Sequence, residues 1–249
     1  LYCLDLATGR EKWNFRGALN DRRVIGAKRV ISRWPLRSGV LIEAGVVYLT
    51  AGMWPSEGVF VYALDARTGK EIWVNDTSAS AFRPQPHVGA MGITGVSPQG
   101  YLAATRDILL VPTGRAIPAG YDRRSGALLH LPTFGFIKQG GAWCAVDRAH
   151  DAYLCGYANR SEWRMAATGE VAPKTATGKF SVVAPRQARA GDVTIQGNDD
   201  AVVAIGPDGA PIWRQPVQGQ ARGLALADGR LFVSTSAGLL YCFAPSTAA

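Results

Sequence analysis

Basic side chains gather in one segment of the sequence, where their type and spacing could bind an anionic group. Between residues 14 and 37, seven arginines and lysines stand against a single acid, Asp21. Guanidinium and ammonium groups at this density attract carboxylates, phosphates or an acidic protein surface. Two further segments, residues 75–98 and 131–141, add cations and aromatic rings. The predicted ligand or partner face comprises Arg22, Arg23, Arg29, Arg33, Trp34, Trp54, Arg83, His87 and Lys138.

The same residues have a plainer interpretation. The rings of Trp34 and Trp54 could pack the long segments onto the rest of the fold, and the arginines could simply be solvated. The formal net charge of +8 fits an Arg-rich protein as well as an anion binder. The sequence contains no Lys/Arg tract longer than two residues and no nucleic-acid module pattern, so nucleic acid is not an expected partner.

Residues for acid–base, nucleophilic or metal chemistry are present but scattered. The three histidines, His87, His130 and His150, have no neighbours that would form a catalytic triad. The carboxylates that could serve a metal or a general base form no recognisable ligand cluster, so we assign no catalytic residue and no metal site. Those carboxylates are Glu43, Glu57, Asp76, Asp107, Asp147 and Asp192.

The four cysteines give no redox or zinc motif. Cys3, Cys144, Cys155 and Cys242 are widely spaced, and no C-x-x-C is present. Cys144 and Cys155 flank a predicted hairpin, where a cross-strand disulfide could form, but two small buried thiols fit the pattern equally well.

The elements that must position these residues repeat along the chain. A turn glycine recurs at spacings of 60, 57, 43 and 40 residues. The two shorter spacings match one four-stranded propeller blade, and the two longer ones match a blade plus a long loop. The marker glycines are Gly9, Gly69, Gly126, Gly169 and Gly209.

Each repeat contains short runs rich in Val, Ile, Leu and Tyr, separated by Gly or Asp, which is typical of strands and hairpins. No segment sustains a helical period. The sequence therefore predicts an all-β fold, a β-propeller of four-stranded antiparallel blades. The chain 1–249 is expected to form one propeller domain or part of one. The expected blades are 38–76, 99–131, 141–174 and 179–215, with partial blades at 1–13 and 221–244.

The turn in each repeat has a structural rather than a catalytic explanation. In "ALDARTGKEIW", from Ala63 to Trp73, Gly69 can adopt a positive φ without steric cost. The Asp65 carboxylate can accept hydrogen bonds from the amides of its own turn. Ala63 leaves room for Trp73 on the next strand, and a tryptophan buries roughly 150–250 Å². The predicted docking residues are Asp5, Gly9, Trp13, Ala63, Asp65, Gly69, Trp73, Gly126, Gly169, Gly209 and Trp213.

This motif resembles the tryptophan-docking repeat of the PQQ-like β-propellers. The match is good from Cys3 to Trp13 and from Ala63 to Trp73, fades where His130 replaces the tryptophan, and partly recovers towards Trp213. The resemblance implies a non-catalytic binding or scaffold propeller of the periplasm or cell envelope, with a protein or glycan partner. The alternative that it implies is a PQQ-dependent quinoprotein alcohol dehydrogenase, with pyrroloquinoline quinone and Ca²⁺. That group often carries adjacent cysteines, which this sequence lacks.

Two arrangements of the repeats remain open at this stage. The chain starts and ends at the same strand position, because "LYCLDL" at residues 1–6 aligns with "LLYCFA" at 239–244. We expect the C-terminal part of an eight-bladed ring whose upstream blades belong to the same polypeptide; a closed five-blade ring is the alternative. No apolar run has the length of a membrane span. In this blade order the Thr-Gly turns lie on one face, and the long segments 14–37, 75–98 and 131–141 lie on the opposite one.

Overall fold

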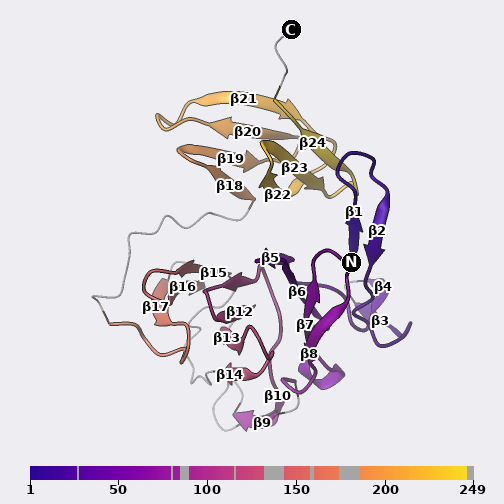
Figure 1. The fold of residues 1–249 in the computed structure, drawn as a ribbon, viewed down its shortest axis with the longest axis vertical. Coiled ribbons are helices and arrows are strands. Elements are labelled where there is room, and N and C mark those ends of the chain that lie inside the picture. Colours follow the sequence, from indigo (N-terminus) through magenta and orange to yellow (C-terminus); the bar gives the residue numbers. More distant parts are fainter. Residues whose placement is uncertain are drawn as a thin grey trace. The chain divides into compact units, whose positions relative to one another are not determined.

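The computed structural model describes residues 1–26, 28–79, 81–84, 90–114, 116–131, 143–157, 160–173 and 186–245. Within these ranges the regular elements are β-strands and a single short 3-10 helix, which confirms the predicted all-β fold class. The chain forms two compact units, Leu1–Gly178 and Lys179–Ala249, and each is described by itself. Figure 1 labels the elements.

The N-terminal unit contains two four-stranded antiparallel sheets and one three-stranded sheet. The order within each sheet follows the sequence, as in a blade whose strands are joined by short hairpins. The first sheet is β5 (Leu41–Glu43), β6 (Val46–Ala51), β7 (Phe60–Asp65) and β8 (Glu71–Asn75). The second is β11 (Ala103–Ala104), β12 (Ile108–Thr113), β13 (Ala116–Asp122) and β14 (Leu128–His130). The third is β15 (Trp143–Asp147), β16 (Ala152–Tyr157) and β17 (Arg160–Met165).

Three two-stranded hairpins and the 3-10 helix complete this unit. One hairpin, at the N-terminus, precedes the first sheet, and two lie in the long connections before and after that sheet. The N-terminal hairpin is β1 (Tyr2–Leu4) and β2 (Glu11–Asn14). The others are β3 (Arg23–Gly26) with β4 (Arg29–Ser32), and β9 (Ala81–Pro84) with β10 (Met91–Thr94). The helix η1 (Pro55–Glu57) joins β6 to β7.

The central strands of the sheets in the N-terminal unit are buried on both faces, and this explains their near-continuous apolar sequences. In β12 every residue is buried, and in β7 all but the last are. Alternate residues of one strand point to different interfaces. Val61 and Ala63 meet the second sheet in a core with Tyr121, whereas Tyr62 and Leu64 pack on the other side with Trp13.

A second blade interface repeats this arrangement between the β11–β14 and β15–β17 sheets. Leu109 and Val111 of β12 face the first sheet, and Ile108 and Leu110 face Tyr153 of the third. Burial of apolar side chains between successive sheets stabilises the stack by about 25 cal/mol per Å² of apolar surface removed from water.

The C-terminal unit is built in the same way from two sheets. Ile195 and Val202 of the first pack against Leu231 and Val233 of the second. The first sheet is β18 (Gln187–Ala190), β19 (Val193–Gly197), β20 (Ala201–Ile205) and β21 (Pro211–Pro216). The second is β22 (Ala221–Ala227), β23 (Arg230–Thr235) and β24 (Leu240–Phe243).

Candidate binding surface

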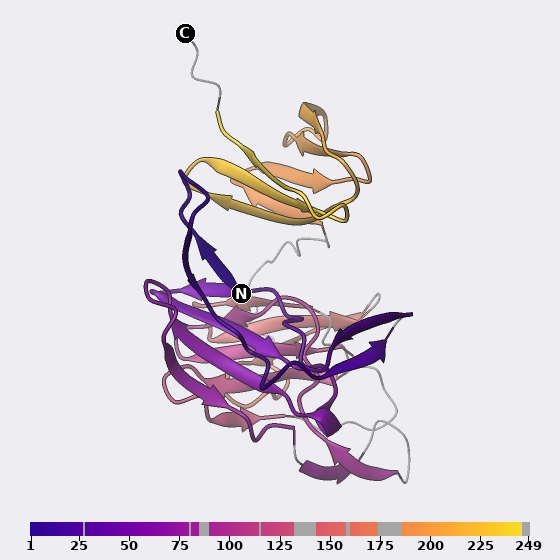
Figure 2. The ribbon, with the colours of Figure 1, turned by 90° about the vertical axis from the view of Figure 1, so that its right-hand side faces the viewer.

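The β3–β4 hairpin lies at the centre of the basic segment and projects from the blades of the N-terminal unit (Figure 2). Ile25 pairs with Val30, and Gly26 pairs with Arg29 next to the hairpin tip. Lys28 at the tip has a φ of 62°, the left-handed conformation that two-residue hairpin turns favour.

One face of this hairpin presents apolar side chains to solvent. Ile25 is 85% exposed and Val30 is 64% exposed. Because directly paired residues share a face of the ribbon, Arg23 and Ser32 lie on the same side as this apolar pair. On the opposite face Val24 and Ile31 form a cross-strand pair and are half-buried. The outer face therefore combines an apolar centre with a guanidinium group at its base.

The base of the hairpin is fixed to the β6–β7 connection. The Trp34 indole is only 5% exposed, and its Nε1 donates a hydrogen bond of 2.7 Å to the Glu57 carbonyl oxygen. Arg33 forms an ion pair with the Glu57 carboxylate, and its guanidinium lies 5.1 Å from the centre of the Trp34 ring. Although both residues belong to the predicted ligand face, these contacts direct them inward, where they hold the segment onto the blade.

The beginning of the basic segment is anchored as well. Gly17 is buried, and a Cβ at this position would lie 2.8 Å from Leu36 Cδ2, so a larger residue would displace the Leu36 side chain. The Gly17 carbonyl oxygen accepts a hydrogen bond of 3.1 Å from the Tyr62 hydroxyl. Burial, with smaller contributions from Glu71 and Asp76, raises the pKa of Tyr62 to about 12.

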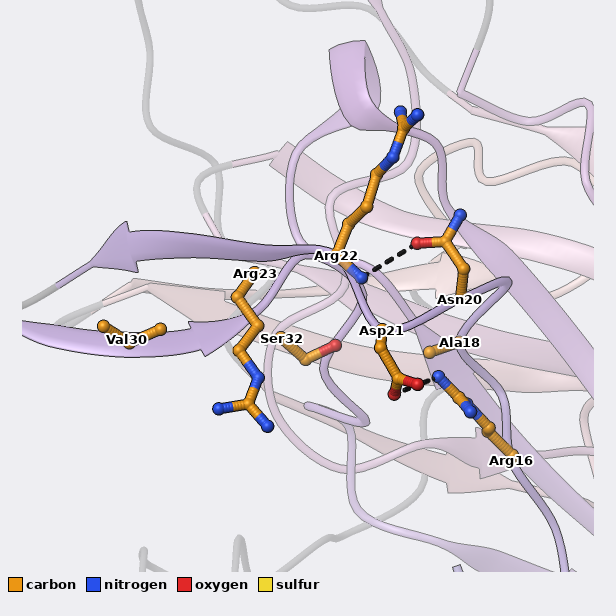
Figure 3. Close-up of a pocket in the computed structure, with 8 residues that line it drawn as sticks. All are labelled: Arg16, Ala18, Asn20, Asp21, Arg22, Arg23, Val30 and Ser32. Carbon is orange, nitrogen blue, oxygen red and sulfur yellow. Dashed lines mark hydrogen bonds and ion pairs between the residues drawn. The ribbon is translucent and has the colours of Figure 1, made fainter.

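A cavity of about 270 Å³ opens at the base of the hairpin (Figure 3). Three arginines contribute to its wall against one carboxylate, and Asp21 is already paired with Arg16. The Asn20 Oδ1 accepts a hydrogen bond of 2.9 Å from the Arg22 amide. In Figure 3 the side chains of Arg22 and Arg23 extend to opposite sides of the hairpin. The lining residues are Arg16, Ala18, Asn20, Asp21, Arg22, Arg23, Val30 and Ser32.

The β9–β10 hairpin adds a second exposed apolar face. Phe82 and Ile93 are opposite each other and are 69% and 66% exposed, and Met91 is 53% exposed. This hairpin lies beside η1, and the Ser97 hydroxyl donates a hydrogen bond of 2.8 Å to the Met53 carbonyl oxygen in the same connection. We name β3–β4, η1 and β9–β10 together the hairpin surface.

The structure brings only part of the predicted face to this surface. Arg22 and Arg23 line the cavity, Arg29 is exposed on β4, and Trp54 beside η1 is 40% exposed. The backbone of Arg83 lies in β9. His87 and Lys138 lie outside the described residues.

Sequence reasoning missed the exposed apolar residues of both hairpins. Ile25, Val30, Phe82 and Ile93 look like buried core residues in composition. The signal that could have found them is a short alternation such as "RVIG" followed by "RVIS" inside a long connection.

The predicted docking turns have the same geometry in successive repeats. The Asp65 Oδ1 accepts hydrogen bonds from the Thr68 amide and hydroxyl, both 2.7 Å long. Asp5 accepts corresponding bonds from Thr8. These bonds lower the pKa of both carboxyls, to about 2 for Asp5. The turn glycines all have positive φ, from 68° to 81°: Gly9, Gly69, Gly126, Gly169 and Gly209.

Trp13 and Trp73 each reach the turn of the following repeat. Trp13 Nε1 donates to the Ala66 carbonyl oxygen over 3.1 Å, and Trp73 Nε1 donates to the Arg123 carbonyl oxygen over 3.0 Å. Ala63 is buried opposite Trp73 in the paired strands. In the C-terminal unit Trp213 lies opposite Ala204 and meets the Phe243 ring edge-on, with ring centres 5.3 Å apart.

The carboxylates are dispersed among basic partners. Glu43 pairs with Arg148 over 2.7 Å, and Asp107 pairs with Arg106 over 2.8 Å. Asp147 pairs with His150, which is the first cause of the lowered pKa of that carboxyl. Within the described ranges, no group of three or more His, Cys, Asp and Glu residues could hold a metal ion.

Cys144 and Cys155 lie directly opposite each other in β15 and β16, and both thiols are free. In the part of the chain that the structure describes, no helix combines the length and apolar character needed to cross a membrane.

Comparison with known proteins identifies the relatives of this chain. The family model described as "Outer membrane protein assembly factor BamB" matches residues 1–142 and 159–249. The search of curated proteins found no match.

Among solved structures, the chain is similar to BamB from Moraxella catarrhalis, with a TM-score of 0.52 and 16% identity over 90% of this chain and 86% of that one. This similarity establishes the β-propeller fold. A computationally designed protein, Ika8, matches with a TM-score of 0.37 and 10% identity over 84% of this chain and 70% of that one. A europium-containing methanol dehydrogenase matches with a TM-score of 0.36 and 14% identity over 78% of this chain and 46% of that one. TM-scores of this size support no inference about function.

Proposed function

Because this chain belongs to the family of the outer membrane protein assembly factor BamB, we propose that it is a non-catalytic binding propeller of the bacterial cell envelope. Its partner is a protein, which docks on the hairpin surface. The family supports a scaffold or binding role in general terms, and the choice of this surface rests on the geometry of the chain itself.

The observation that carries the proposal is the display of apolar side chains on two projecting hairpins. Ile25, Val30, Phe82 and Ile93 are each more than 60% exposed, although isoleucine, valine and phenylalanine are among the most often buried residues. Exposed apolar groups rimmed by charge mark sites of protein–protein contact. The cavity at the hairpin base has few groups that could act in catalysis, because its one carboxylate, Asp21, is paired with Arg16. The cavity therefore suits recognition more than catalysis.

The proposed compartment is the periplasm, where the assembly of outer membrane proteins takes place. We propose no cofactor. Three of the carboxylates that a quinoprotein site could use, Glu43, Asp107 and Asp147, form ion pairs with basic side chains, which favours the binding propeller over that alternative.

Site-specific photo-crosslinking in cells of the native host tests this function. A photoreactive residue at Ile25 or at Phe82 is expected to give one and the same protein adduct. The matched control is the same residue at Arg67, an exposed position in a docking turn. A second readout is release of the protein with the periplasmic fraction. The proposal is wrong if the two hairpin positions give no adduct, or if Arg67 gives the same adduct with equal yield.

A further inference from the structure

The β3–β4 hairpin has two open strand edges. Within the described residues, β3 and β4 pair only with each other. A two-stranded ribbon of this kind presents unpaired backbone N–H and C=O groups along both sides, and an extended segment of another protein can add to it as a third strand.

The positions of the hydrogen bonds between β3 and β4 determine which backbone groups point outward. The Arg33 amide donates a hydrogen bond of 3.0 Å to the Arg22 carbonyl oxygen, so these two residues form a hydrogen-bonded pair. Bonded and non-bonded pairs alternate along an antiparallel ribbon. The Arg23–Ser32 and Ile25–Val30 pairs are therefore the non-bonded ones. Their amide and carbonyl groups point away from the hairpin, at Arg23 and Ile25 along the β3 edge and at Val30 and Ser32 along the β4 edge.

Charge favours one kind of added strand. In the described structure the side chains of Arg22, Arg23, Lys28 and Arg29 form no ion pair, whereas Arg16 and Arg33 are paired. Two of the four unpaired cations lie at the start of β3, and Arg23 also lines the cavity. An acidic strand along β3 would place carboxylates beside these cations, where arginine can bind them in a bidentate manner.

The apolar face adds a second requirement. Ile25 and Val30 lie together on one side of the ribbon, and Arg22 and Arg29 lie on the other side. A strand whose residues alternate between aliphatic and acidic would extend both faces at once, because side chains of a strand alternate between its two sides.

We propose that β3 binds an extended acidic segment of the partner protein, in which aliphatic and acidic residues alternate, as a third strand of the hairpin. This inference rests on the proposed function and names the chemistry of its partner. Backbone bonds to Arg23 and Ile25 set the register, and the aliphatic side chains lie beside Ile25. The acidic side chains lie beside Arg22, on the face of the ribbon that also carries Arg29 of β4 across Gly26. A terminal carboxylate of the segment reaches Arg23 in the cavity.

The test uses the full chain and a fluorescent decapeptide that alternates valine and glutamate, with a valine–lysine decapeptide as its matched control. Fluorescence anisotropy gives Kd for each. We expect the glutamate peptide to bind at least tenfold more tightly than the lysine peptide. The double substitution Arg22→Glu with Arg29→Glu is expected to raise the Kd of the glutamate peptide at least tenfold. The proposal fails if the two peptides bind equally, or if the glutamate peptide does not bind at 1 mM.

A pair of proline variants locates the edge. Proline lacks the amide donor and is tolerated where that amide points away from the ladder. Ile25→Pro removes an amide donor from the β3 edge and is expected to raise the Kd of the glutamate peptide at least tenfold. Val30→Pro removes an amide donor from the β4 edge and is expected to change this Kd less than twofold. Equal effects of the two variants overturn the choice of β3.

Hydrogen exchange on the unmodified protein covers the case in which a proline variant does not fold. The glutamate peptide is expected to slow exchange of the Ile25 amide at least tenfold and to leave the Val30 amide unchanged. Binding without protection of Ile25, or an equal response to a polyuronate of similar charge, shows simple charge attraction and overturns strand addition. If these tests fail while crosslinking from Ile25 and Phe82 succeeds, the proposed function stands and only the acidic strand is wrong.

Discussion

The imidazole Nε2 of His130 lies 2.8 Å from the carbonyl oxygen of Ala166. Ala166 has the same place in its turn as Ala66 and Arg123, whose carbonyl oxygens accept the bonds from Trp13 and Trp73. His130 therefore takes the docking position of a tryptophan, with a smaller ring and the same kind of hydrogen bond.

Replacement of this imidazole by an indole is expected to stabilise the fold. Gly120 is opposite His130, and a Cβ there would lie 2.1 Å from the imidazole Nε2. Because Gly120 has no side chain, His130→Trp has at least the space that Trp73 finds over Ala63. We expect a gain of about 1 kcal/mol in the free energy of unfolding from additional apolar burial. His130→Ala is expected to lose about 1–3 kcal/mol. Urea denaturation measures both, and a loss for His130→Trp contradicts the assignment.

The stability of the protein is expected to fall as the pH decreases below about 6.5, the ordinary pKa of histidine. Burial, together with the positive charge of Arg164, lowers the pKa of His130 in the fold, although the bond to Ala166 opposes this. The unfolded chain then binds more protons than the folded one between the two pKa values, so the free energy of unfolding decreases with falling pH. The difference between the wild type and His130→Trp should grow over this range. Urea titrations at pH 7.5 and 5.5 test this, and a constant difference would falsify it.

The carboxyls of the docking turns affect the stability of the protein at lower pH than His130 does. Hydrogen bonds lower the pKa of Asp5, Asp65 and Asp122, so the stability that they contribute is lost only as the pH falls below their ordinary value of about 4. The effect of His130 can therefore be measured separately from theirs.

Gly9 and Gly69 form a matched pair that isolates the docking contact. Both have a φ near 70°, and both follow a threonine in an Asp-locked turn. A Cβ at Gly69 would lie 2.6 Å from Trp13 Cδ2, whereas a Cβ at Gly9 would meet no atom within 4 Å. Gly9→Ala is expected to cost about 1–2 kcal/mol from the left-handed backbone alone. Gly69→Ala is expected to cost at least about 1 kcal/mol more, because the indole must move.

Urea denaturation of the two alanine variants provides the comparison. The double variant Trp13→Ala with Gly69→Ala removes the clash, so the two substitutions together should cost less than the sum of their separate effects. Equal losses for Gly9→Ala and Gly69→Ala would show that Trp13 does not rest on this turn.

The cysteines are expected to differ sharply in reactivity. Burial raises the pKa of the Cys155 thiol to about 11 and that of Cys144 still further, whereas Cys242 is exposed. The thiolate is the reactive form of cysteine. In the reduced native protein we therefore expect Cys242 to react with a chromogenic thiol reagent within minutes at pH 8, and Cys155 to react only on unfolding. The variant Cys3→Ser with Cys242→Ser is the control, because Cys3 is also free and partly exposed. Fast reaction of Cys155 in that variant would show that the β15–β16 face opens readily.

The sequence predicted the fold class well because each repeat combines several local signals. The positions of Asp65, Gly69 and Trp73 recur at nearly fixed spacing in the repeats. Turn geometry or packing explains the residue type at each of these positions. His130 differs from the other docking residues in type but occupies the same position in space. Only the structure reveals this, because Gly120 comes from the neighbouring strand and the Ala166 carbonyl from the turn after β17.

The candidate site could be predicted only as a segment. The positive charge of the segment can be read from the sequence, but the solvent exposure of each side chain cannot. Arg33 and Trp34 have the composition of a ligand face, yet contacts with Glu57, more than twenty residues away, direct them inward. Ile25 and Val30 look like core residues, yet their side chains are exposed, and no further strand among the described residues pairs with their hairpin.

The docking bonds in the N-terminal unit all run in one direction along the chain. The ring at the end of one blade always rests on the turn of the blade that follows, as Trp13, Trp73 and His130 do in succession. The unit is therefore held together by nearest-neighbour joints with a polarity. Because each joint links two neighbours, loss of either blade removes the whole joint. The smallest docking ring is that of His130, so we expect the array to part first between the β11–β14 and β15–β17 sheets.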